Sequence, residues 1–387
     1  MNSDVVLSVI RVVQPIGEIY IGSIPSRKLW EIAEYDMREI REKEDGIYLA
    51  TGIQRKLDER RVSEIATYVT TVDATFPTAV VLAVSSDCVN FNGSGEGGCL
   101  EMRLASSPEE ENPSEEGGLF AYRRIARVID GQHRIEGLKR SQKEDFDVNV
   151  AIFVDADIED QARVFATVNL SQTKVSKSLV YDLFSYSTAL SPEKMAHSVC
   201  LSLDQTKGSP LHHRIKRLGT ATPGRTREEP LSQATFVEGI LSHIVPSKEQ
   251  LIRDRDWARR GKRFPKPSLT EARRLVLRRF FVEGRSVDVA ELLWNYFEAV
   301  TKVFKDDWKV GGVGSILPRT NGYRALMRFF RDAYNEIAAP GDLVSTEEFE
   351  RIFKRVKHLR GQFTTDNYPP GTSGESRLYS DLRQALR

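Results

Sequence analysis

The sequence predicts an α+β protein, with a mixed-sheet domain in residues 1–186 and a mainly helical region in residues 187–387. In the first half, short β-branched runs such as 79–84 and 148–154 alternate with segments whose apolar residues lie three and four apart. After residue 187, helical spacing dominates and strand-like alternation is rare. A region with strand patterns followed by a region with helical patterns is typical of an α+β chain.

Each element follows from its own pattern. We expect strands over 5–13, 19–22, 79–84, 99–104, 125–129 and 148–154. We expect helices over 26–40, 62–69, 135–138, 158–169, 177–186, 287–304, 321–330, 349–358 and 377–386. Thr372 and Glu375 have the spacing of a capping box before the last of these helices.

Composition limits the class of protein. The chain has 387 residues, 40% apolar residues and a net charge of +1, which is enough for two domains with buried cores. It has no apolar run of membrane-spanning length and no secretory signal at Met1, so we expect a cytoplasmic protein without a membrane partner. Cys88, Cys99 and Cys200 have no metal-ligand spacing and are expected to be free thiols.

The central stretch Asp130-Gly131-Gln132-His133-Arg134 lies between a predicted strand and a predicted helix. The first N–H groups of a helix are unpaired and carry partial positive charge, so they attract anions. Gln132, His133 and Arg134 could complete a phosphate site there. In the plainer alternative, Asp130 caps the helix, Gly131 allows a backbone twist, and the His-Arg pair has no function.

Two further polar loops flank predicted helices. Gln54 and Arg55 come just before the helix at 62–69. Asn169, Gln172 and Lys174 lie between two helices and could hold a Mg²⁺-phosphate group through amide oxygens and an ammonium group. Alternatively, Asn169 ends one helix and Ser176 caps the next. The Lys-Ser/Thr ending of a Walker A loop is absent from the sequence, which excludes an ordinary P-loop ATPase.

The five residues from Asp130 to Arg134 spell the signature of the DGQHR-domain family. That family includes DndB-type proteins of DNA phosphorothioation systems and DpdB-type proteins of DNA deazaguanine-modification systems. It resembles a distant branch of the ParB/sulfiredoxin-like fold. The Gln54-Arg55 loop is similar to the first ParB-like box without its proline. Asn169 and Gln172 match the third box, where Thr167-Val168 replaces the usual acidic residue.

The resemblance implies a nucleotide-binding, ATP-hydrolysing protein that acts with DNA and a DNA-modifying partner enzyme in bacterial DNA modification, of the deazaguanine type, and in phage defence. Its implied cofactors are ATP, or another nucleoside triphosphate, and Mg²⁺. The implied catalytic residues are Asp130, His133 and Arg134. The implied nucleotide ligands are Gln54, Arg55, Gly131, Gln132, Arg134, Asn169, Gln172 and Lys174, with Asn169 and Gln172 also as metal ligands.

Two alternatives to the ATPase stay open. One is a non-catalytic DNA-binding transcription regulator of a phosphorothioation system. The other is a nuclease, for which the sequence offers no clustered carboxylates. A homo-oligomer is also left open.

A basic stretch points to DNA. Between residues 251 and 280 there are eleven Lys/Arg and three Asp/Glu, although the whole chain is nearly neutral. The predicted DNA-binding residues are Arg259, Arg260, Lys262, Arg263 and Lys266. These cations, together with Arg253 and Arg255, could follow a phosphate backbone, while Trp257 and Phe264 stack on bases or sugars. The plainer alternative is a solvated segment, or one paired with acidic residues of the same chain.

Overall fold

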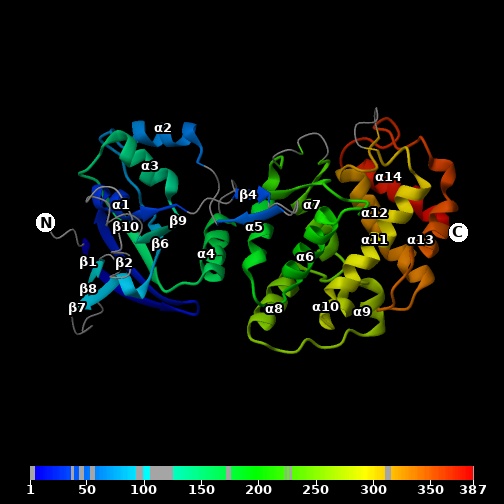
Figure 1. The fold of residues 1–387 in the computed structure, drawn as a ribbon, viewed down its shortest axis with the longest axis horizontal. Helices are drawn as coiled ribbons and strands as arrows, with labels where there is room; N and C mark the ends of the chain where they lie inside the picture. Colours follow the sequence, from blue (N-terminus) through cyan, green and yellow to red (C-terminus); the bar gives the residue numbers. More distant parts are fainter. Residues whose placement is uncertain are drawn as a thin grey trace. The chain divides into compact units, whose positions relative to one another are not determined.

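The structure is a computed structural model that describes residues 5–35, 39–42, 48–52, 57–92, 99–104, 125–170, 176–222, 225, 229–309 and 315–386. The chain divides into two compact units, Met1–Lys174 and Val175–Arg387. A mixed sheet occupies the first unit and helices dominate the second, which confirms the predicted α+β class (Figure 1). The functional domain boundary after residue 186 stays a prediction.

The N-terminal unit is built on an eight-stranded sheet with the order β3-β9-β6-β10-β2-β1-β8-β7. Its strands are β1 (Val5–Gln14), β2 (Gly17–Pro25), β3 (Ala33–Glu34), β6 (Val80–Val84), β7 (Val89–Asn92), β8 (Cys99–Leu104), β9 (Ala126–Asp130) and β10 (Asp147–Val154). β10 with β6 and β3 with β9 pair in parallel, and the other neighbours pair antiparallel. The sheet is therefore mixed, as predicted.

Alternating burial explains how the sheet forms a core. Along β1, Val5, Leu7 and Val9 are buried while the residues between them are exposed. β6 is buried along its whole length, as expected of a central strand. The helices of this unit are α1 (Ser26–Ile32), α2 (Glu59–Tyr68), α3 (Gln132–Ser141) and α4 (Ile158–Leu170). Residues of α1 and α3 join the sheet's buried cluster, and α4 contacts β9.

A glycine sets how closely α2 and α3 approach. A Cβ atom on Gly137 would lie 2.4 Å from Cγ2 of Ile65, so no larger residue fits at this point of α3. The close crossing brings the start of α2 next to the start of α3, where the Asp58 N–H donates to Nε2 of His133 (3.1 Å).

The predicted helix over 26–40 is wrong at residues 33–34 and 39–40, which are strands, and residues 36–38 lie outside the described ones. α1 ends at Ile32 because Ala33 and Glu34 extend to form β3, which pairs with β9. Further on, β4 (Glu39–Glu42) pairs with β5 (Tyr48–Thr51) in a separate two-stranded sheet. Strand pairing has overridden an apolar spacing that is helical in this sequence.

The C-terminal unit packs helices around one large core. Its helices are α5 (Lys177–Asp182), α6 (Pro192–Gln205), α7 (Gln233–Leu241), α8 (Lys248–Arg259), α9 (Leu269–Arg274), α10 (Arg278–Val282), α11 (Ser286–Val303), α12 (Thr320–Ile337), α13 (Thr346–Lys354) and α14 (Thr372–Arg383). Two short strands, β11 (Ile215–Lys216) and β12 (Leu231–Ser232), pair in parallel. The 3₁₀ turns of the chain are Ser86–Cys88, Leu183–Tyr186, Arg217–Gly219, Lys357–Leu359 and Gln384–Leu386. Buried aromatic rings such as Tyr296 and Phe330 fill the centre of this unit.

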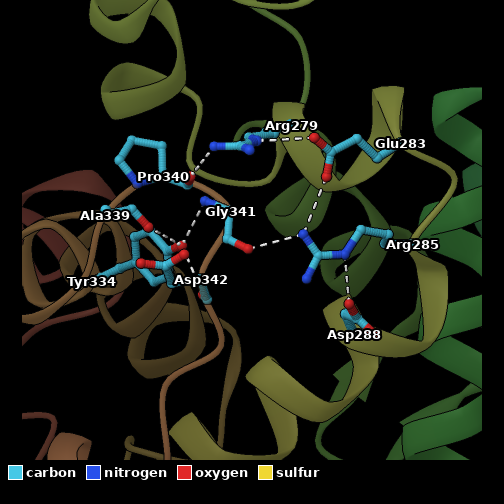
Figure 2. Close-up of polar contacts among 9 residues, drawn as sticks. All are labelled: Arg279, Glu283, Arg285, Asp288, Tyr334, Ala339, Pro340, Gly341 and Asp342. Atoms are coloured by element: carbon cyan, nitrogen blue, oxygen red, sulfur yellow. Dashed lines mark hydrogen bonds and ion pairs between the residues drawn. The ribbon is translucent and has the colours of Figure 1, made fainter.

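Two arginines hold the corner between α10 and α11 to the loop that joins α12 and α13 (Figure 2). Arg279 donates to the Pro340 carbonyl (2.8 Å), and Arg285 donates to the Gly341 carbonyl (2.9 Å). Both also donate to the carboxylate of Glu283, at 2.9 and 3.1 Å, and the hydrogen bond from Arg279 lowers the pKa of Glu283. These two guanidinium groups therefore serve the fold.

The predicted capping box at Thr372 is wrong. α14 begins at Thr372 itself, with Gly371 as its N-cap at φ +99° and without a side-chain cap. The left-handed backbone at Gly371 turns the chain directly into the helix, so Thr372 takes the first helical position. Among the described residues, no helix is both long and apolar enough to cross a membrane.

Candidate functional site

The Asp130 turn, residues 130–134, joins β9 to α3 as predicted. Gly131 has φ +107° and is the N-cap of α3, so Asp130 does not cap the helix as the plainer alternative proposed. A Cβ atom on Gly131 would lie 2.8 Å from Cγ2 of Val80. The position needs glycine both for its backbone angle and for its close approach to β6.

Arg134 is engaged inside the protein. Its Nη1 donates to the carbonyl and the hydroxyl of Thr78, at 2.5 and 3.0 Å. Its Nη2 donates to the Ala79 carbonyl (3.1 Å) and to Oδ2 of Asp130 (3.0 Å). Two carbonyls, a hydroxyl and a carboxylate thus surround the two terminal nitrogens of this guanidinium.

Burial shapes the electrostatics of the pair. The side chains of Arg134 and Asp130 are 16% and 21% exposed. Burial lowers the pKa of Arg134, and the charge of Asp130 opposes that shift. An arginine keeps its proton at neutral pH in any case, so the pair is a charged internal contact.

His133 and Gln132 are also buried, at 6% and 5% exposure. Nε2 of His133 accepts the Asp58 N–H, and Asp58 in turn caps α2 by accepting the Arg60 and Arg61 N–H groups. The Asp130 turn therefore ties the end of β9 to the start of β6 and to the start of α2. Its described contacts are those of a structural joint.

In the described part of this turn, the guanidinium of Arg134 is directed at the protein and not at a ligand. A phosphate site needs a cation that can face the ligand, but Arg134 already faces Thr78, Ala79 and Asp130. We therefore derive no hydrolytic step through Asp130, His133 or Arg134. Gly131 is the N-cap of α3 and Gln132 is its first residue, as the prediction of a helix start at this turn requires.

The other predicted ligands lie elsewhere in the chain. Gln54, Arg55, Gln172 and Lys174 lie outside the described residues, and Asn169 is described only as part of α4. Within the described ranges, no group of three His, Cys, Asp or Glu residues could hold a metal ion. ATP and Mg²⁺ stay predictions.

The basic stretch lies in the helical unit, on α8, α9 and the connection between them, residues 260–268 (Figure 1). All five predicted DNA-binding residues are exposed: Arg259, Arg260, Lys262, Arg263 and Lys266. Arg260 pairs with Asp256 at 2.8 Å, and both side chains are at least half exposed. In the described part of the chain, no carboxylate pairs with Lys262, Arg263 or Lys266.

Other cations of the stretch serve the fold. Arg278 is buried and makes two hydrogen bonds to the buried carboxylate of Asp254. Arg255 lies 3.4 Å from the buried Glu193, whose pKa burial raises. The eleven Lys/Arg residues of the stretch therefore include arginines in internal ion pairs as well as solvent-exposed cations.

Phe264 anchors the connection between α8 and α9. Its ring lies 4.7 Å from that of Phe281 and 6.4 Å from that of Trp257, and it packs against the core of the helical unit. The prediction that Phe264 stacks on bases does not agree with this inward position. The aromatic ring holds the loop, and the neighbouring cations face solvent.

Sequence reasoning left two exposed cations of α9, Arg273 and Arg274, out of the predicted interface. Arg253 is exposed on α8, and Arg273 and Arg274 are exposed on α9. The signal was present, because Ala272 and Leu275 mark the buried face of α9 and place its two arginines outside. We call the following eight exposed cations the basic surface: Arg253, Arg259, Arg260, Lys262, Arg263, Lys266, Arg273 and Arg274.

Comparison with known families gives one finding. The model of the DndB family, described as DNA-sulfur modification-associated, matches residues 7–207. The match covers more than half of the chain, including the Asp130 turn, and ends before the basic surface. No curated protein and no solved structure matches the chain, so the predicted ParB/sulfiredoxin likeness stays a prediction. The chain belongs to the DndB family of DNA-sulfur modification-associated proteins.

Proposed function

We propose that this protein is a non-catalytic DNA-binding regulator of a DNA phosphorothioation system, and that it acts beside the enzyme that modifies the DNA. Membership of a DNA-sulfur modification-associated family supports the system. The observation that carries the DNA contact is the basic surface, where Lys262, Arg263 and Lys266 face solvent on an anchored connection.

The charge balance of the basic surface explains why it would bind DNA. Of the nearby carboxylates, Asp254 is buried against Arg278 and Asp256 pairs with Arg260. Lys262, Arg263 and Lys266 have no ion pair with a described carboxylate, so the segment does not neutralise their positive charge. Each phosphate that such a cation contacts releases counterions, so affinity falls steeply as salt rises.

The Asp130 turn supports the non-catalytic part of the proposal. Its arginine and histidine are used between segments of the N-terminal unit. A binding protein needs such a joint for rigidity, whereas phosphoryl transfer needs cations directed at the ligand.

The direct test is binding to a duplex fragment taken from upstream of the protein's own gene. We expect binding with a steep salt dependence, and we expect the triple variant Lys262→Ala, Arg263→Ala, Lys266→Ala to reduce the slope of log affinity against log salt by about 2.7. The matched control replaces three exposed cations on other elements, Lys305, Arg351 and Lys357, by alanine. Equal loss in both triples would show that only net charge matters and would remove the assigned surface.

ATP hydrolysis in a deazaguanine-type system is the competing function. It rests on the resemblance to ParB-like boxes, of which Gln54, Arg55 and Gln172 lie outside the described residues. A panel of nucleoside triphosphates with Mg²⁺, with and without DNA, separates the two functions. We expect no phosphate release, and turnover that Arg134→Ala abolishes in a folded protein would establish the ATPase instead.

A further inference from the structure

The connection between α8 and α9 has no regular secondary structure from residue 262 to residue 268, yet its middle is packed. Phe264 is half-buried between Trp257 on α8 and Phe281 on α10. Lys262 and Arg263 precede it and Lys266 follows it, all exposed. The inward ring of Phe264 therefore lies between the exposed cations of the connection.

Both ends of the connection are fixed as well. On α8, Asp254 is fully buried and pairs with Arg278 of α10. At the other end, the Ser268 side chain caps α9 by accepting the Glu271 N–H. Pro265 and Pro267 restrict the backbone between Phe264 and this cap.

We propose that Phe264 is a positioning residue, which holds Lys262, Arg263 and Lys266 as a preformed array for the phosphates of DNA. The inference rests on the proposed function and adds to it how the surface recognises its ligand. Because the ring of Phe264 is used inward, it takes no part in base stacking, and the array recognises backbone charge.

Anchoring matters because ordering a loop opposes binding. Fixing the backbone of a residue has an entropic cost, and a connection that is already ordered in the free protein avoids that cost when DNA binds. An unanchored connection would carry the same charges but bind more weakly. Affinity would then change while the number of phosphate contacts, and so the salt slope, would stay the same.

The test compares Phe264→Ala with Phe264→Leu by fluorescence anisotropy, using a duplex and a single strand of equal length. Phe264→Leu keeps an apolar anchor and is expected to bind the duplex within about two-fold of the wild type. Phe264→Ala is expected to bind the duplex at least about ten-fold more weakly, with an unchanged salt slope. Thermal unfolding checks that the helical unit stays folded.

A second variant keeps the test valid if Phe264→Ala does not fold. Pro265→Gly with Pro267→Gly loosens the connection without removing a core ring, and we expect the same loss of duplex affinity at constant slope.

Three results would overturn the inference. In the first, a folded Phe264→Ala or the double glycine variant binds duplex as tightly as the wild type. In the second, Phe264→Leu loses affinity for the single strand as strongly as Phe264→Ala does, which would mean that the ring stacks on bases. In the third, the wild-type protein binds neither DNA, which removes the proposed function itself.

Discussion

The Asp130 turn and the basic surface both place cations beside the end of a helix, but they treat those cations in opposite ways. At the turn, the chain supplies its own acceptors, since Asp130 lies one helical turn before Arg134 and the carbonyls of Thr78 and Ala79 face it. On the α8–α9 connection, Lys262 and Arg263 have no ion pair with a described carboxylate. An arginine that pairs with an internal anion stabilises the fold. A cation without a nearby acceptor is available to bind a ligand.

This contrast separates two kinds of effect. Changes at the Asp130 turn should lower the free energy of unfolding of the N-terminal unit and leave the salt dependence of DNA binding unchanged. Changes on the basic surface should do the reverse. Three of the four predictions below test that separation, and the one on His243 tests the core of the helical unit.

The largest effect is expected for Arg134→Ala. The substitution leaves the Asp130 carboxylate and two carbonyls without the guanidinium that now pairs with them. We expect the free energy of unfolding of the N-terminal unit to fall by about 3 kcal/mol. Denaturant-dependent hydrogen exchange of β9 and α3 measures it.

Arg60→Ala is the matched control for Arg134→Ala. Arg60 is 88% exposed and pairs with Glu64 at 3.0 Å on the surface of α2. Surface pairs of this kind contribute about 0.5 kcal/mol or less. If both variants are equally stable, Arg134 is not the internal joint that we describe.

The next effect concerns acid and the core of the helical unit. His243 is fully buried, and its Nε2 lies 2.8 Å from the Met327 carbonyl. No described atom hydrogen-bonds to Nδ1, where a second proton would have to sit. Burial lowers the pKa of His243 to about 4. In the unfolded chain the pKa is about 6.5, so the unfolded state binds the proton first.

The stability that His243 contributes is therefore complete above about pH 6.5 and is lost as pH falls to about 4, by about 3 kcal/mol in all. The Leu277 N–H donates to the His243 carbonyl, and the next residue, Arg278, pairs with Asp254 of α8. The loss of stability therefore affects the helices that carry the basic surface. Urea unfolding of the wild type and His243→Gln at pH 7, 5.5 and 4 measures it. If the free energy of unfolding of the wild type falls no more steeply with pH than that of His243→Gln, the pH dependence does not come from His243.

Two glycines with positive φ allow a direct comparison of the Asp130 turn with the α8–α9 connection. Gly131 has φ +107° and no room for a Cβ atom, whereas Gly261 has φ +61° and open space around it. We expect Gly131→Ala to cost about 2 kcal/mol and Gly261→Ala about 1 kcal/mol, because only the first adds steric conflict to backbone strain. Urea denaturation measures both, and an equal cost would mean that the turn relaxes around the methyl group.

Local pattern was enough to predict most of the fold. β-branched runs located β1, β6, β9 and β10, and apolar spacing located α2, α4 and α11. The error beyond Ile32 shows the limit of such reasoning. Ala33 and Glu34 became a strand because β9, nearly a hundred residues later, offers an edge for pairing, and a local window does not contain that information.

The candidate sites show the same limit for charge. The sequence places Asp130 and Arg134 at helical spacing, so their ion pair was accessible to local reasoning. The carbonyls of Thr78 and Ala79 were not, because they come from the segment just before β6, more than fifty residues earlier in the chain. On the basic surface, the pairing of Asp254 with Arg278 across two helices likewise decides which cations stay exposed.

The smallest effect on stability, and the sharpest test of the contrast, is expected for Lys262→Ala. Lys262 is exposed on the connection and pairs with no carboxylate in the described chain, so its removal should change the free energy of unfolding by less than about 0.5 kcal/mol. The same change removes one phosphate contact and should lower the salt slope of duplex binding by about 0.9. Titrations of duplex at several salt concentrations, beside Arg134→Ala, give the comparison. If Arg134→Ala lowers the salt slope as much as Lys262→Ala does, the turn also faces DNA and the separation of the two regions fails.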